Sequence, residues 1–369
     1  MYLEEISLNN FKNYIKNKTD FSKKINCFVG DNGVGKTNLL DAIYYLSFCK
    51  SYFNSIDSQN ILHEANFFSI HGKYKKDSNT DIISCIQKRN HKKQFELNGN
   101  KYTRLSEHIG LFPLVMISPA DNNLIYSWSE DRRKYINRVI SQFDKFYLED
   151  VINYNKVLVQ RNTLLKHFAE KHFFDKLSIE IWDKQMIMLG NKIYEKRKKF
   201  LKKISPVFQK YYKFITQDKE LVSIEYQSQL TNTDFKELLA NSLEKDRILQ
   251  YSTTGIHKDD FVFKMQNFSI KKFGSQGQQK SFIIALKLAQ FDYTKNIKGF
   301  NPVLLFDDIF DKLDDNRLTQ LIKLVSNNNF GQIFITDTDK QRIKKIFSNI
   351  KTECKMFEIK HGKIIKLKK

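Results

Sequence analysis

Hydrophobic and polar residues alternate along most of the first hundred positions, and this two-residue period predicts short β-strands. One helix interrupts the strands, because apolar residues recur at helical spacing from Asn38 onward. A strand, a glycine-containing loop and this helix follow one another and form a βα unit. The predicted strands are Tyr2–Leu8, Ile25–Val29, Phe67–Tyr74, Asp81–Gln87 and Gln94–Leu97, and Asn98-Gly99 predicts a turn.

A helical period replaces the alternation after the apolar run Leu111–Ile117. Three charge-rich segments with almost no glycine predict helices at Glu130–Phe146, Leu148–His172 and Phe174–Ile215. An apolar stripe down the third helix is typical of packing between helices and consists of Trp182, Met186, Leu189 and Ile193. Strands are predicted again at Leu221–Tyr226, Asp260–Met265 and Pro302–Phe306, with a helix from Ser275 to about Thr294.

The two ends of the chain therefore share an α/β pattern, and a helical region separates them. We expect residues 1–118 and 251–369 to form one α/β lobe. Residues 119–250 are expected to form an inserted helical lobe.

The charge balance indicates a class of partner, because 62 Lys and Arg against 41 Asp and Glu give a net charge of +21. This surplus favours a polyanion such as nucleic acid or an anionic membrane surface. Codon bias toward a Lys-rich composition is the alternative explanation for part of the excess.

Segments for membrane insertion or export are not evident in the sequence. No apolar run approaches the roughly 18 residues of a membrane-spanning helix, and the acidic start Met1–Glu5 lacks the features of a signal peptide. The cysteines are too scattered for a disulfide framework or a zinc site, and they are Cys27, Cys49, Cys85 and Cys354. We therefore expect a soluble protein of the reducing cytoplasm.

Residues 30–37 read GDNGVGKT and fit the phosphate-binding pattern G-x-x-x-x-G-K-[ST] between a strand and a helix. The pattern predicts ATP and Mg²⁺ as cofactors. Lys36 is expected to contact the β- and γ-phosphates and to serve catalysis, and Thr37 is expected to bind Mg²⁺. The predicted nucleotide-binding residues of this loop are Gly30, Asp31, Asn32, Gly33, Val34, Gly35, Lys36 and Thr37.

The apolar strand Pro302–Phe306 ends in two carboxylates, which suits the partner site of a P-loop NTPase. Asp307 is expected to hold Mg²⁺, and Asp308 to polarise the attacking water. A capped strand end is the alternative for these two residues when they are taken alone.

A small-residue turn at residues 273–280 leads into the predicted helix. Ser275, Gly277 and Gln278 at this helix N-terminus predict a second phosphate cradle. Because one γ-phosphate does not need two complete cradles, we expect each cradle to serve the nucleotide of the other subunit in a head-to-tail homodimer. A simple serine N-cap is the alternative.

These residues resemble ABC-type ATPases of the SMC-like branch and, within it, the RecF family of bacterial recombinational repair. The resemblance covers nearly the whole chain. Its stretches are Leu8–Tyr14, the P-loop, Ile117–Asp121 with Arg132-Arg133, Gly255–Asp260, Ser275–Gln278, Asp307-Asp308 and Leu313-Asp314.

The resemblance implies an α/β ABC-type P-loop ATPase head with an inserted α-helical lobe. It implies a weak, DNA-stimulated ATPase that forms a homodimer with ATP and binds DNA at gaps or single-stranded/duplex junctions. It implies cooperation with RecO and RecR in loading RecA, and no binding to a membrane. The signature residues would touch the γ-phosphate across the dimer, Asp314 would lie in the D-loop, and 337–339 would form the switch region.

The chain departs from related families at three places. Transporter-type relatives usually carry Glu at the position of Asp308 and a switch His, and no His occurs here between His257 and His361. Slow turnover is the expected consequence. RecF sequences often carry a basic pair after the first helix, whereas this chain has Lys50 and then Phe53 or Asn54.

Two further groups of residues have open roles. The run from Lys196 to Lys203 indicates either a solvated helix face or a DNA contact. His257, Asp259 and Asp260 lie within four positions, and a hydrogen-bonded turn is expected there rather than a metal site.

Other function classes suit the chain less well. An SMC arm needs very long helices, whereas an insertion of about 120 residues reaches only about 90 Å as two helices. A transporter subunit would lack this insertion, and a small-molecule kinase has no use for the signature. An SMC-type or transporter-type ABC subunit stays the alternative.

Overall fold

The computed structural model describes residues 1–217, 220–309, 315–326, 330–348 and 353–367. The chain divides into two compact units, and each is described by itself. Unit 1 comprises Met1–Asn122, Tyr211–Lys219 and Ser275–Lys369, and unit 2 comprises Asn123–Lys210 and Glu220–Gly274. The division differs from the predicted lobe boundaries mainly because residues 251–274 fall in unit 2. The assignment of residues 1–118 and 251–369 to one lobe and of residues 119–250 to another stays a prediction.

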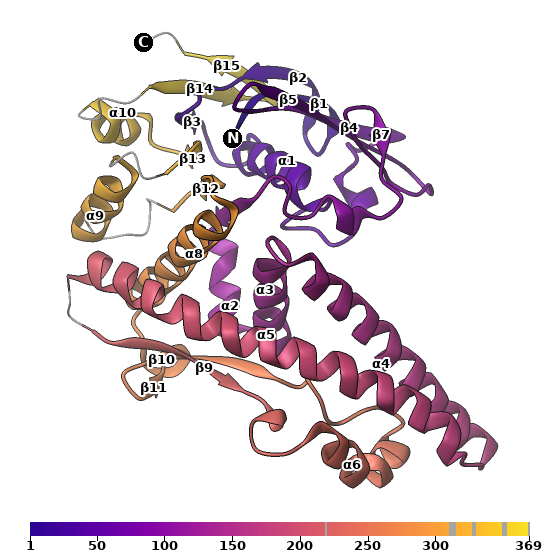
Figure 1. Ribbon diagram of the computed structural model, residues 1–369. Coiled ribbons are helices and arrows are strands. Elements are labelled where there is room, and N and C mark those ends of the chain that lie inside the picture. Colours follow the sequence, from indigo (N-terminus) through magenta and orange to yellow (C-terminus); the bar gives the residue numbers. More distant parts are fainter. Residues whose placement is uncertain (218–219, 310–314, 327–329, 349–352, 368–369) are drawn as a thin grey trace. The chain divides into compact units, whose positions relative to one another are not determined.

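Unit 1 contains two six-stranded sheets (Figure 1). The first is mostly parallel, in the order β15-β14-β3-β13-β12-β8, and its strands are β3 (Ile25–Val29), β8 (Leu114–Ile117), β12 (Val303–Asp307), β13 (Ile333–Asp337), β14 (Cys354–Lys360) and β15 (Lys363–Lys366). The second is antiparallel, in the order β2-β1-β4-β5-β6-β7, and its strands are β1 (Tyr2–Phe11), β2 (Tyr14–Asp20), β4 (Phe67–Lys76), β5 (Asn79–Lys88), β6 (Gln94–Leu97) and β7 (Asn100–Lys101).

Helix α1 (Lys36–Phe48) lies in the core of unit 1. It packs against strands of both sheets, and almost all of its residues are buried. Because the helix is covered on nearly every side, its apolar residues are not confined to one stripe. The other helices of the unit are α8 (Gln276–Lys298), α9 (Asp315–Ser326) and α10 (Lys340–Ser348), with short 3₁₀ turns at Asp57–Asn60, Leu105–Glu107 and Pro119–Asn122.

Unit 2 combines helices with a small antiparallel sheet. Helices α4 (Lys145–Lys171) and α5 (Lys176–Thr216, ending in unit 1) form a long hairpin (Figure 1). The remaining helices are α2 (Asn123–Tyr126), α3 (Ser129–Ser141), α6 (Phe235–Leu249) and α7 (Ile270–Phe273), with a 3₁₀ turn at Gln229–Thr231. Strand β10 (Asp260–Met265) pairs with β9 (Val222–Gln227) and β11 (Phe268–Ser269), so the predicted strand at 260–265 belongs to a sheet of unit 2.

The predicted strands of unit 1 and the βα unit are confirmed. The predicted helix Glu130–Phe146 is wrong in extent, because α3 ends at Ser141 and a new helix starts at Lys145. The Asp144 side chain accepts a hydrogen bond from the Tyr147 backbone N–H at 2.8 Å, which caps the start of α4. The apolar stripe is core, as predicted, since Met186 and Ile193 are fully buried.

Among the residues that the structure describes, no helix has both the length and the apolar content needed to cross a membrane.

Candidate functional site

The loop between β3 and α1 has the backbone geometry of a phosphate cradle. Gly30, Gly33 and Gly35 have φ values of 152°, 80° and 115°, which residues with a side chain rarely adopt. A Cβ at Gly30 would lie 2.6 Å from the Ile359 carbonyl oxygen. Such a turn directs successive N–H groups toward one point at a helix N-terminus, and this arrangement binds anions.

Lys36 is buried, although it carries a charge. Its Nζ donates to the carbonyl oxygens of Gly30 at 2.8 Å and Asp31 at 2.9 Å. It is only 4% exposed, and it forms no ion pair within the described part of the chain. A buried ammonium that is held only by carbonyl oxygens fits a site for an anionic ligand such as a phosphate.

The two carboxylates predicted from the end of β12 lie beside the loop. The Thr37 hydroxyl donates to Asp307 Oδ1 at 2.9 Å, and the Thr336 hydroxyl donates to the same oxygen at 2.9 Å. Burial raises the pKa of Asp307 to about 6, while its two threonine hydrogen bonds oppose the rise. The P-loop thus supplies a hydroxyl and the end of β12 supplies a carboxylate. These are the oxygen ligands that Mg²⁺ takes in P-loop NTPases.

Asp308 has a left-handed backbone, with φ at 46°. Its N–H donates to the Thr336 hydroxyl at 3.0 Å, so Thr336 contacts both acidic residues. Asp308 borders a cavity of about 40 Å³, which is also lined by Ser118, Asn122 and Lys280. This volume is sufficient for a water molecule.

The predicted signature lies at the start of α8. Ser275 is the N-cap, and its hydroxyl and the Gln278 side chain form a reciprocal capping box. The serine-cap alternative therefore describes a real contact, which leaves the predicted phosphate role untested. A Cβ at Gly277 would meet the end of the Arg317 side chain, which would then have to move aside.

The comparisons with known proteins agree with each other. The model of the family described as RecF/RecN/SMC N terminal domain matches residues 2–362. The DNA replication and repair protein RecF of Bacteroides fragilis (strain YCH46) is 49% identical over 365 residues, which cover 99% of this chain and 98% of that protein. RecF of Flavobacterium johnsoniae is 48% identical over 97% of this chain and 100% of its own length. This chain belongs to the RecF family.

Solved structures agree with the family assignment. The structure of the recombination mediator protein RecF-ATP in the RecFOR pathway has a TM-score of 0.90 and 31% identity, over 100% of this chain and 98% of that chain. An Smc head bound to the C-winged helix domain of ScpA has a TM-score of 0.57 at 16% identity and shares the fold alone. The predicted fold class, an ABC-type ATPase head with an inserted helical lobe, is confirmed.

Sequence reasoning missed Asn13, which supports the P-loop of this RecF-family protein. Asn13 Nδ2 donates to the Val34 carbonyl oxygen at 2.9 Å, and Asn13 Oδ1 accepts from Asn38 Nδ2 at 2.8 Å. A Cβ at Gly35 would lie 2.5 Å from the Asn13 amide. Asn13 belongs to the stretch that carries the family resemblance, but no local signal places it against the loop. Thr336 was missed for the same reason.

The segment after α1 contains no second basic residue beside Lys50, as the sequence shows. Instead, Lys12 Nζ lies 2.6 Å from Asp41 Oδ2 and 5.5 Å from the centre of the Phe53 ring.

Lys287 on α8 forms a buried ion pair with Asp121 at 2.6 Å. Asp314, the predicted D-loop residue, and Leu313 lie outside the described residues.

Residues 337–339, the predicted switch region, form hydrogen bonds at the start of α10. Asp339 Oδ1 accepts from the N–H groups of Gln341 and Arg342, and Asp337 Oδ1 accepts from Arg342 Nη2 at 3.2 Å. Both carboxylates therefore stabilise the start of α10.

His257, Asp259 and Asp260 contact different residues. His257 contacts the Tyr154 hydroxyl at 2.9 Å and the Ser252 carbonyl oxygen at 3.1 Å. Asp260 forms a two-point ion pair with Arg132, and the Asp259 carboxylate accepts from Arg197 and Tyr226. Within the described residues, no group of His, Cys, Asp and Glu side chains could hold a metal ion.

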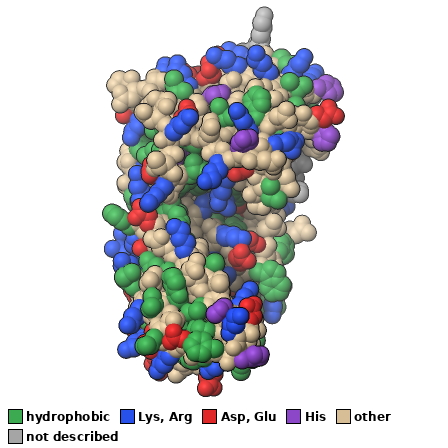
Figure 2. Space-filling view, turned by 90° about the vertical axis from the view of Figure 1, so that its right-hand side faces the viewer, with side chains coloured by type: hydrophobic (Ala, Val, Ile, Leu, Met, Phe, Trp, Pro, Cys, Tyr) green, Lys and Arg blue, Asp and Glu red, His purple; other side chains and the backbone are tan. Residues whose placement is uncertain are grey.

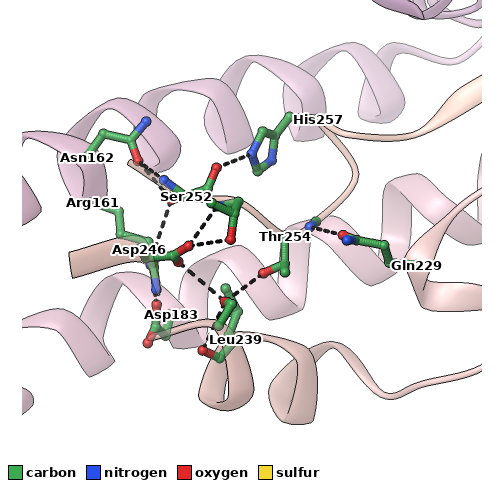
Figure 3. A network of polar contacts seen from close by, with 12 residues as sticks. Arg161, Asn162, Asp183, Gln229, Leu239, Asp246, Ser252, Thr254 and His257 are labelled. Carbon is green, nitrogen blue, oxygen red and sulfur yellow. Dashed lines mark hydrogen bonds and ion pairs between the residues drawn. The ribbon is translucent and has the colours of Figure 1, made fainter. Parts of the chain in front are cut away.

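A buried polar network adjoins this segment in unit 2 (Figure 3). The Arg161 guanidinium donates to Asp183 and Asp246 at 2.6 Å each and to Ser252 Oγ at 2.9 Å. Arg161 and Asp246 are fully buried. Arg197, from the basic run on α5, is likewise buried and paired with Asp259 at 2.8 Å. This part of the run therefore holds unit 2 together, whereas Lys198 and Lys199 are exposed.

Proposed function

We propose that this protein is an ATP-dependent DNA-binding protein of recombinational repair and replication-fork maintenance. It binds single-stranded and duplex DNA at gaps or junctions as an ATP-gated homodimer. In this function it acts with RecO and RecR to help load RecA. Its membership of the RecF family supports the general role.

The observation that carries the proposal is the contact between Thr37 and Asp307, which joins the P-loop to the end of β12. ATP would bind with its phosphates in the loop of residues 30–37, next to Lys36. Thr37 and Asp307 would hold Mg²⁺, which when bound neutralises charge on the β- and γ-phosphates.

Asp308 acts as the residue that polarises the attacking water. The cavity beside its side chain provides the space for that water. Aspartate is shorter than the glutamate found at this position in transporter-type relatives, so hydrolysis is slow. ATP hydrolysis then works as a switch that releases the dimer.

The signature residues Ser275, Gly277 and Gln278 contact the γ-phosphate of the other subunit. Ser275 and Gln278 lie at an exposed helix N-terminus, which supports contact with a partner. ATP therefore joins two copies head to tail. Each composite site contains the P-loop of one copy and the signature of the other.

The net charge of +21 supports DNA as the ligand. Lys and Arg side chains are spread over the face of the molecule in Figure 2, with Asp and Glu between them. Such a surface attracts the phosphate backbone with little sequence preference.

DNA-binding titrations with and without ATP test the proposal. The substrates are gapped, duplex and single-stranded oligonucleotides of equal length, and sedimentation reports the dimer. We expect ATP to induce the dimer and to favour the gapped substrate. Lys36→Met should abolish both effects, because the phosphates lose their cationic partner. Equal, nucleotide-independent binding to all three substrates would contradict the proposal, as would a Lys36→Met variant that still dimerises with ATP.

A further inference from the structure

Four aromatic rings of unit 2 are unusually exposed. They are Trp128 at 87%, Phe273 at 64%, Phe268 at 54% and Tyr126 at 49% exposure. Large aromatic side chains normally bury most of their surface, and an exposed group of them marks an interaction site.

These rings come from elements that pack against each other. Helix α2 packs against α3 and α7, and α7 packs against β10 and β11. Lys271 Nζ donates to the Tyr126 carbonyl oxygen at 2.6 Å. The rings of Phe268 and Phe273 are 5.3 Å apart and T-shaped. The aromatic–lysine patch is defined as Tyr126, Trp128, Phe268, Lys271, Lys272 and Phe273.

The backbone under the patch is firmly held. Arg132 donates to the carbonyl oxygens of Leu124 at 3.2 Å and Ser127 at 2.9 Å, and its other nitrogens bind Asp260 at 2.8 and 2.9 Å. The link between α2 and α3 is thus tied to β10. Trp128 is presented to solvent from a fixed backbone, so little order is lost when a ligand binds it.

The charge of the patch itself is positive. Lys271 and Lys272 are exposed, and neither forms an ion pair within the described residues. The nearby carboxylate of Asp260 is engaged by Arg132, and that of Glu225 is engaged by Lys264.

We propose that the aromatic–lysine patch binds single-stranded nucleic acid. Bases stack on the exposed rings, and Lys271 and Lys272 contact the phosphates. The proposal rests on the proposed function for the identity of the ligand and adds the place and mode of binding.

The charges favour nucleic acid over a protein occupant. Unpaired lysines are depleted from the cores of protein interfaces. A polynucleotide supplies both the flat apolar surfaces and the anions that the patch lacks.

The chain contains only two tryptophans, which allows a direct test. Trp182→Phe leaves Trp128 as the only indole. This protein, at fixed concentration and without ATP, is titrated with a dye-labelled oligothymidylate of about 20 nucleotides. Trp128 fluorescence and the anisotropy of the dye are measured in the same titration. We expect stacking to quench Trp128 emission along the same binding curve.

Phe273→Ala, made in this background, should weaken binding about tenfold or more, and Lys272→Gln should weaken it at low salt and reduce its salt dependence. The matched control is Phe146→Ala, which removes a ring that is 75% exposed on α4 and outside the patch. It should bind like its parent. Lys272→Gln alters only an exposed side chain, so its result stands even if Phe273→Ala is unstable.

Three outcomes would overturn the proposal, and they have different meanings. If the oligonucleotide binds normally but Trp128 emission and the affinity of the patch variants do not change, single strands bind elsewhere on the protein. The proposed function as a DNA-binding protein would then still hold. Trp128 emission that depends on protein concentration without DNA would assign the patch to a second copy. No binding to single-stranded, duplex or gapped DNA under any condition would refute the proposed function as well.

Discussion

The P-loop site of unit 1 and the polar network of unit 2 both bury charged groups, but they treat the charges differently. Lys36 and Asp307 are bonded to carbonyl oxygens and hydroxyls, and neither forms an ion pair among the described residues. Arg161 and Arg197 instead contact Asp246 and Asp259 directly. A buried charge that pairs with an opposite charge has a structural partner, and removing that partner is costly, whereas a buried charge without an opposite partner indicates a ligand.

The largest effect is expected from breaking the network of unit 2. Asp246→Ala would leave the buried Arg161 without its fully buried partner and would remove the hydrogen bonds of Thr253. Removing one member of a buried ion pair costs about 3–5 kcal/mol. Urea unfolding of the nucleotide-free protein measures this loss.

The matched variant for unit 1 is Asp308→Asn, because asparagine tolerates the left-handed backbone at this position. We expect its stability to change by no more than about 0.5 kcal/mol, while ATP binds and hydrolysis stops, so that the dimer is trapped. If Asp308→Asn lost as much stability as Asp246→Ala, or if its steady-state hydrolysis were unchanged, the contrast between the sites would be wrong.

Buried histidines should make stability depend on pH. Burial lowers the pKa of His108 in unit 1 and of His257 in unit 2 to about 4. Because an unfolded chain protonates histidine near about pH 6.5, stability is full above that pH and is lost as the pH falls toward 4. The loss for His108 is at most about 3 kcal/mol.

Urea unfolding between pH 7 and pH 4 tests this expectation. His108→Gln should flatten the pH dependence, whereas His63→Gln, which alters a side chain that is 95% exposed, should not. An equal slope in His108→Gln and the wild type would show that folding does not lower the pKa of His108.

A smaller effect is expected from loosening the P-loop support. Asn13→Ala removes the bonds to Val34 and Asn38, and we expect ATP affinity to fall about tenfold, since each such bond contributes about 1 kcal/mol. Asn17→Ala is the control, because Asn17 holds the β15 region through Gly362 and Ile364. Calorimetric titration with ATP should separate the two variants. Equal ATP affinities would remove the positioning role of Asn13.

Elements with strong local patterns could be predicted from the sequence. The bounds of β3, β6 and β10 match the prediction, because each is a short apolar or alternating run between polar turns. Helix α6 was missed, since its core-facing positions include the polar Ser242 and Asp246, which obscure the apolar period. Strand β2 was missed because its alternation is mostly polar, with Ile15 69% exposed.

The same limit applies to the site. The P-loop could be found because consecutive residues determine its backbone. Asn13 reaches it from the turn between β1 and β2, and Thr336 reaches it from β13, so only the sheet order brings them there. The pairing of β10 with β9, which places residues 260–265 in unit 2, is equally non-local.

The central claim is that ATP joins two copies through composite sites, and mixing two inactive variants tests it most directly. Ser275→Arg should bind ATP as a monomer but fail to dimerise, because its side chain fills the cradle for the partner's γ-phosphate. Lys36→Met lacks the other half of the site. When both folded variants are mixed at high concentration with DNA, one composite site is intact, and we predict that part of the DNA-stimulated hydrolysis returns. No hydrolysis in the mixture would contradict the account, and a loss of only about 1 kcal/mol of stability in Ser275→Arg would then leave Ser275 as a helix cap.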